Sequence, residues 1–188
     1  MKRPLFYSAL AAGLLGFSMT ASANFIGNYA PGNWRVGNTL YDSGIVDTTS
    51  APGSSITLIG SDNSSGEFSR VDFSIVAPVA GTFSFDWAFS STDTLGAGYE
   101  TAGYLKNGQP QLYPNDLGNI LSGRKSVPVT AGDVFGFYVI TQDNLGGSAS
   151  LTISDFSAPV PEPASVAMMA LGLLGLVGVA AARRRRLP

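Results

Sequence analysis

The last 29 residues of this chain contain the sequence feature that most restricts its structure. Nineteen residues, Ala164 to Ala182, carry no charge, and Ser165 is their single polar side chain. As a helix rising about 1.5 Å per residue, this stretch approaches the roughly 30 Å hydrocarbon core of a bilayer. Four arginines follow it and favour the cytoplasmic side of a membrane. The sequence therefore predicts a C-terminal transmembrane helix over 164–182.

A proline-rich tripeptide, Pro161, Glu162 and Pro163, comes directly before this apolar stretch. The basic cluster after it consists of Arg183, Arg184, Arg185 and Arg186. Together, over residues 160–188, they resemble the PEP-CTERM sorting signal of Gram-negative bacteria. The resemblance implies a transient anchor in the inner membrane, processing near the tripeptide by an exosortase, and a final location at the cell surface or outside the cell. Proteins with this signal often accompany exopolysaccharide and biofilm production.

The first 23 residues have the pattern of a secretory signal peptide. Lys2 and Arg3 precede the mostly apolar segment Leu5–Phe17, and Ala21-Ser22-Ala23 supplies small residues for a cut after Ala23. We therefore expect a signal helix at the N-terminus that is removed on export. An uncleaved anchor is the alternative, but the apolar run is short for a membrane span. With these two signals, we expect the N-terminus to start on the cytoplasmic side and the four C-terminal arginines to stay there. Residues 24–159 between them are expected to be exported.

The exported segment of 136 residues is long enough for one domain with a single core. Its five basic and twelve acidic residues give a net charge of −7, which argues against nucleic acid and anionic lipid as partners. The charge is compatible with cations or neutral polymers. The chain has no cysteine and no histidine, which excludes disulfides, Ser-His-Asp catalysis and a zinc site with His or Cys ligands.

Apolar residues recur with a period of two in the exported segment, which is typical of strands with one buried face. This pattern is clearest over 70–75, 82–90 and 134–141, and the last of these has apolar residues on both faces. Shorter strands are expected at 56–59 and 151–153. The sequence predicts an all-β protein of seven to nine strands, an antiparallel β-sandwich of jelly-roll type.

The connections between these strands are expected to be rich in turns. Asn107-Gly108 is the signature of a type I′ hairpin. Long loops are expected over 91–100 and 114–125, and an irregular N-terminal arm over 29–44. Residues 157–161 are expected to form a short linker to the C-terminal anchor.

Three runs of the exported segment are similar to the strand signatures of CUB-like sandwiches: Gly81–Trp87, Tyr99–Gly108 and Phe135–Asn144. The cysteines of many CUB domains are missing here. Some CUB domains bind Ca²⁺ through loop carboxylates, and the resemblance implies that Glu100, Asp143 and Asn144 form such a site, with Asp93 completing it. Carboxylate, amide and carbonyl oxygens suit Ca²⁺. The alternative is that these residues cap turns through their own backbone.

Aromatic residues in Gly-, Asn- or Pro-rich loops are candidates for stacking on sugar rings. Trp34 and Tyr113 are expected to be the most exposed of them. Packing in the core is the alternative for both.

The sequence contains no recognisable catalytic motif, although Asp86, Asp93 and Glu100 leave glycoside hydrolysis as a remote alternative. The reading that best fits these observations is a non-catalytic surface or matrix protein, sorted by an exosortase and associated with exopolysaccharide. The alternative is a calcium- or carbohydrate-binding module.

Overall fold

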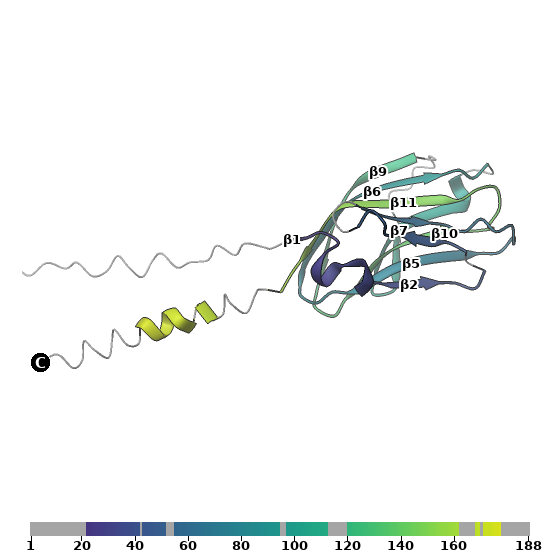
Figure 1. Cartoon of the computed structure of the whole chain (residues 1–188). Coiled ribbons are helices and arrows are strands. Elements are labelled where there is room, and N and C mark those ends of the chain that lie inside the picture. Colours follow the sequence, from purple (N-terminus) through teal and green to yellow (C-terminus); the bar gives the residue numbers. More distant parts are fainter. Residues whose placement is uncertain are drawn as a thin grey trace, which may run out of the picture.

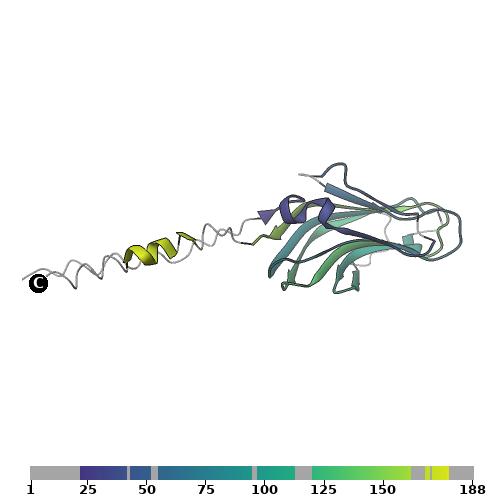
Figure 2. The same ribbon diagram turned by 60° about the horizontal axis from the view of Figure 1, so that its bottom comes forward.

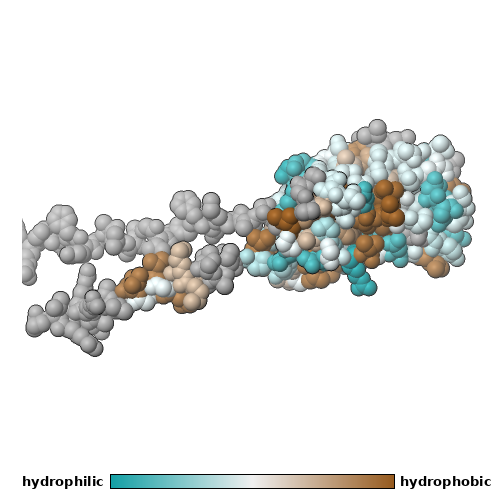
Figure 3. All heavy atoms as spheres, in the orientation of Figure 1, coloured by the Kyte–Doolittle hydropathy of each residue, from teal (hydrophilic) through white to brown (hydrophobic). Residues whose placement is uncertain are grey.

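The computed structural model describes residues 22–41, 43–51, 55–94, 97–112, 120–161, 168–169 and 171–177. The expected signal helix, except for Ser22 and Ala23, lies outside the described residues. Residues 168–169 and 171–177 are helical, and Figure 3 shows this stretch as mostly hydrophobic. Within the described residues, no helix has the length and apolar character needed to cross a membrane.

Strands dominate the described residues between Ser22 and Pro159, and short 3-10 turns interrupt them. The strands are β1 (Ser22–Ala23), β2 (Arg35–Asn38), β3 (Ile45–Asp47), β4 (Ser55–Ile59), β5 (Ser69–Val76), β6 (Gly81–Ser91), β7 (Glu100–Lys106), β8 (Gln109–Leu112), β9 (Ile120–Val129), β10 (Val134–Thr141) and β11 (Ala149–Pro159). The 3-10 turns are η1 (Gly27–Tyr29), η2 (Pro31–Asn33) and η3 (Ala97–Tyr99).

The strands form two antiparallel sheets packed face to face (Figure 1). One has the order β3-β4-β11-β6-β9, with β1 added to the end of β11, and the other has the order β2-β5-β10-β7-β8. The chain crosses between the sheets at each step from β4 to β7 and from β8 to β11. The predicted antiparallel β-sandwich is therefore confirmed.

The period-two pattern identifies the inner faces of the central strands correctly. Val71, Phe73 and Ile75 of β5 are buried, as are the alternating aromatic residues of β6. Residues 135–139 of β10 are all buried, so this strand is covered on both faces as expected. On its outer face Tyr138 lies across Gly103, where a side chain would overlap both the tyrosine and the Gln111 carbonyl group. Glycine at position 103 is what permits this close packing.

The core between the sheets is built largely from aromatic rings, and Phe156 of β11 lies at its centre. Its ring centroid is 4.6 Å from Phe25 and 5.6 Å from Trp34, and it also contacts Phe83 and Phe137. Phe156 faces inward because the β6–β11 register shifts between Ser154 and Ser157. A bulge of this kind moves the following side chains to the other face of the sheet.

Three connections differ from expectation. The expected loop over 114–125 contains the start of β9, an edge strand that runs from residue 120, and the expected linker over 157–161 contains the end of β11. The expected irregular arm over 29–44 contains η2 and β2 and packs into the core. The Asn107-Gly108 hairpin between β7 and β8 is confirmed, with positive φ at both residues.

The expectation that Trp34 is exposed is wrong. Its side chain is 7% exposed and stacks on Phe73 with ring centroids 4.8 Å apart. Its indole N–H donates a hydrogen bond to the Tyr29 carbonyl oxygen at 2.9 Å. The flanking glycine and asparagine residues suggest a surface loop, but burial of a large indole with a satisfied N–H outweighs that local composition.

We expect Phe156→Ala to lower the free energy of unfolding by about 3–5 kcal/mol. The substitution leaves a cavity among five aromatic rings, those of Phe25, Trp34, Phe83, Phe137 and Tyr29. Urea denaturation followed by tryptophan fluorescence measures this loss. Phe68→Ala is the matched control, since Phe68 is 46% exposed. Equal losses in the two variants would contradict the central role of Phe156.

Candidate functional site

Two buried carboxyl groups lie where the sandwich ends opposite β1. Glu100 opens β7 and is 2% exposed, and Asp93, in the loop after β6, is 3% exposed. The hydroxyl of Ser91, the last residue of β6, connects them. It donates to Glu100 Oε2 and accepts a hydrogen bond from the Asp93 backbone N–H at 3.0 Å. Because β6 and β7 belong to different sheets, the Glu100 carboxyl group lies between the sheets.

The surroundings of Glu100 disfavour its charge. Burial raises the pKa of Glu100 from 4.5 to about 7, and the nearby Asp93 and Asp62 carboxylates contribute in the same direction. The Ser91 hydroxyl and the Ala149 backbone amide oppose this rise in the pKa. Glu100 therefore changes charge near neutral pH.

Two further oxygen atoms at this end of the sandwich are buried and have no hydrogen-bond partner among the residues that the structure describes. They are Oε1 of Glu100 and Oγ1 of Thr141, and these two residues are register partners on β7 and β10. A buried polar atom without a partner has a free-energy cost of about 1–3 kcal/mol, so such atoms are candidates for ligand contacts.

Asp143 and Asn144 use their side chains for other contacts. Asp143 Oδ1 accepts a hydrogen bond from the Leu145 backbone N–H at 3.1 Å, as in a turn cap. The Asn144 amide is fully buried, accepting from the Ser69 hydroxyl and donating to the Glu67 carbonyl oxygen at 2.6 Å. The structure therefore brings Asp93 and Glu100 together. The Asn144 side chain instead holds its own loop against residues 67–69 by hydrogen bonds.

Within the described residues, no group of three or more His, Cys, Asp or Glu side chains is placed to hold a metal ion. Tyr113 lies outside the described residues. Sequence reasoning did not identify Ser91, because a single serine at the end of a strand carries no local signal of its position between two carboxyl groups.

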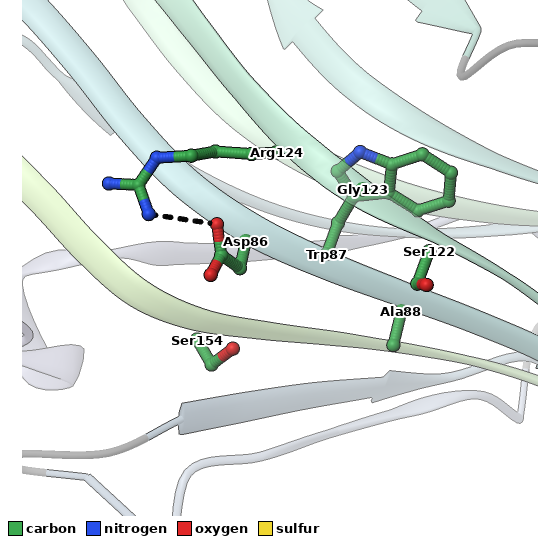
Figure 4. Close-up of a pocket in the computed structure, with 7 residues that line it drawn as sticks. All are labelled: Asp86, Trp87, Ala88, Ser122, Gly123, Arg124 and Ser154. Atoms are coloured by element: carbon green, nitrogen blue, oxygen red, sulfur yellow. Dashed lines mark hydrogen bonds and ion pairs between the residues drawn. The ribbon is translucent and has the colours of Figure 1, made fainter.

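A second candidate site is an open hollow on the outer face of the β9-β6-β11 sheet (Figure 4). It is lined by Asp86, Trp87, Ala88, Ser122, Gly123, Arg124 and Ser154. Arg124 Nη1 donates to Asp86 Oδ1 at 3.1 Å across the two strands. The Trp87 ring packs against Gly123, where an added Cβ would lie 3.1 Å from the indole. The sequence analysis did not identify this pair as a binding site.

The end of the domain that leads to the Pro-Glu-Pro tripeptide is firmly attached to the sandwich. The Tyr29 hydroxyl donates to the Pro159 carbonyl oxygen at 2.6 Å, and the Pro159 ring packs against Gly81. Figure 2 shows η1 and η2 at this end, against the end of β11. The tripeptide therefore begins only two residues after this fixed position. Glu162, Pro163 and the four arginines lie outside the described residues.

A family model for the PEP-CTERM protein-sorting motif matches residues 159–186. The chain carries a PEP-CTERM motif. No curated relative matches its sequence. The family match begins at Pro159, so the motif starts where the folded domain ends.

Solved structures with a similar arrangement include carbohydrate-binding modules. A family 35 module from Clostridium thermocellum has 10% identity and a TM-score of 0.34, covering 71% of this chain and 95% of the module. The module CBM6cm-2 from Cellvibrio mixtus lichenase 5A, in complex with cellotriose, has 12% identity and a TM-score of 0.34, covering 76% and 98%.

The raised pKa of Glu100 predicts how stability changes with pH. The folded protein binds this proton more tightly than the unfolded chain, so its stabilising effect is complete below about pH 4.5 and is lost as pH rises to about 7. We expect Glu100→Gln to remove this part of the pH dependence. Urea denaturation between pH 4.5 and pH 8 in a chelator measures it, and an unchanged difference between the two proteins across that range would contradict the assignment.

Proposed function

We propose that this protein is an exported, non-catalytic protein of the cell surface or extracellular matrix, sorted by an exosortase. The observation that carries the proposal is the PEP-CTERM motif at residues 159–186, directly after the folded domain. The apolar stretch anchors the chain in the inner membrane of a Gram-negative bacterium. Processing near Pro161 then releases the β-sandwich to its final location.

The tripeptide has a physical role in this proposal. Pro161 and Pro163 fix φ and lack backbone donors, so they keep the chain extended outside the bilayer. Glu162 is thereby presented to the processing enzyme. The fixed position of Pro159 limits how far the enzyme can reach before it meets the folded domain.

The partner at the final location is proposed to be exopolysaccharide. The acidic, histidine-free domain suits a neutral polymer better than nucleic acid.

The jelly-roll subclass of the sandwich is also proposed, and it is supported by the repeated crossing of the chain between the two sheets. The likeness to CUB domains stays a prediction of the strand signatures.

We expect Glu162→Ala, or alanine at all four positions 183–186, to leave unprocessed precursor in the membrane. Loss of the arginines removes the charge that holds the C-terminus inside the cell. Immunoblots of membrane and culture fractions measure the ratio of precursor to released domain. An arginine-to-lysine variant of the cluster is the control for charge, and normal release of both the Glu162 and the alanine variants would defeat the sorting proposal.

A calcium-binding module is the second candidate, and the buried Asp93–Glu100 pair favours it. The two carboxyl groups and the Thr141 hydroxyl supply the hard oxygen ligands that Ca²⁺ prefers. Among the described residues, Oε1 of Glu100 and Oγ1 of Thr141 have no hydrogen-bond partner. Bound Ca²⁺ would offset the unfavourable charge of Glu100. Asp143 and Asn144 are the less suitable ligands, because their side chains already bind the backbone or neighbouring loops.

This candidate predicts that the exported protein melts at a higher temperature with Ca²⁺ than with EGTA. A ligand present at 100 times its Kd and bound to the folded state alone contributes about 2.7 kcal/mol, which corresponds to several degrees for a domain of this size. Glu100→Ala should abolish the increase, whereas Asp143→Ala should retain it. Identical melts with and without Ca²⁺ would exclude the calcium candidate and leave the sorting proposal intact.

A further inference from the structure

The hollow around Asp86 has a regular arrangement that follows from the strand register. Asp86 lies between Ser154 of β11 and Arg124 of β9, and all three project from the outer face (Figure 4). In the next row Ala88 lies between Thr152 and Ser122. Because the side chain of Ala88 is short, the sheet is indented beside a carboxylate and a guanidinium group.

The ion pair in this hollow is open to solvent. The Arg124 side chain is 62% exposed and that of Asp86 is 37% exposed. Exposed pairs of this kind contribute little to stability, so folding alone does not explain the pair. Among the described residues the two side chains share a single hydrogen bond, which leaves N–H donors of Arg124 and the second carboxylate oxygen of Asp86 available to a ligand.

Hydroxyl groups cover the sheet on both sides of the hollow. Ser84 and Ser126 are paired at 2.9 Å, as are Ser90 and Ser150. Thr57 and Thr152 extend the same surface at 3.1 Å. Short hydroxyl side chains both donate and accept, and little side-chain entropy is lost when they bind.

The charge around the hollow favours a neutral ligand. Lys125 projects from the opposite face of β9, as register partner of Phe85, and lies over the Tyr104 ring with its Nζ 5.6 Å from the centroid. Asp155, at the bulge next to Ser154, is exposed and adds negative charge. With a net charge of −7 on the exported domain, an anionic polymer would be repelled overall.

We propose that this hollow binds a sugar unit of a neutral polysaccharide. The Asp86 carboxylate accepts a hydrogen bond from one ring hydroxyl, and the Arg124 guanidinium donates to the neighbouring hydroxyl. Ala88 provides the space for the ring, and Ser122 and Ser154 border it. The hydroxyl rows beyond the hollow then contact adjoining units of the chain. This assignment deepens the proposed association with exopolysaccharide and rests on it.

Affinity gel electrophoresis of the full chain in a mild detergent tests the assignment, with dextran, hydroxyethylcellulose and galactomannan as neutral probes and alginate as the anionic probe. We expect at least one neutral polymer to retard the protein. Ala88→Leu fills the hollow, and Arg124→Gln replaces the guanidinium fork by a shorter, neutral amide, so each should weaken binding about tenfold or more. Lys125→Gln is the matched control, because it removes the same charge from the other face of β9 and should bind as the unmodified protein does.

Retardation that persists in both Ala88→Leu and Arg124→Gln would overturn the assignment, as would equal loss in Lys125→Gln. Retardation by alginate alone, or by no polymer, would overturn it too. Thermal melts of the three variants establish that each is folded. Release from the membrane is measured separately in cells, so a protein that is released normally but binds no glycan would contradict this site and leave the sorting proposal standing.

Discussion

The fold depends on a one-residue irregularity in β11. Up to Ser154 the even-numbered residues of this strand face solvent, and without the bulge Phe156 would do so as well. Asp155, with a φ of 46°, absorbs the extra residue, and Asp tolerates this left-handed conformation better than most residues. Phe156 thereby enters the core, where its ring packs against Phe25 and Trp34 of the N-terminal segment. A domain without disulfides is thus closed by packing of aromatic rings.

The sequence predicted those parts of the fold in which local pattern and long-range packing agree. The alternating residues of β5, β6 and β10 show their buried face directly. β9 was missed because it is an edge strand whose first half includes Gly123, Arg124 and Lys125, and burial becomes regular only at Val127 and Val129. Trp34 was misplaced because its burial depends on Phe73 and Phe156, which are distant in sequence and carry no signal around position 34.

In the candidate sites, too, the sequence indicated some residues that lie together, whereas other neighbours are set by long-range strand pairing. Asp93 and Glu100 are seven residues apart, and the resemblance to CUB domains had placed both in one expected calcium site. The serine between them was not predictable, because its contact with Glu100 joins two sheets. Asp86 and Arg124 are 38 residues apart and become neighbours through the β6–β9 register. Period-two alternation shows which face of a strand is buried, but it does not show which residue lies opposite.

The pairing of β1 with β11 bears on when the predicted signal peptide is removed. Ser22 and Ala23 are register partners of Pro159 and Ala158, and Phe25, two residues later, is fully buried. A protease needs its target bond in accessible, extended chain, and these contacts withdraw the bond after Ala23 from reach. The sequence predicts that signal peptidase cuts there, and we infer that such a cut precedes the closing of the sandwich. The proposed exosortase cut near Pro161 follows Pro159, the last residue of β11, so it would require no opening of the sandwich.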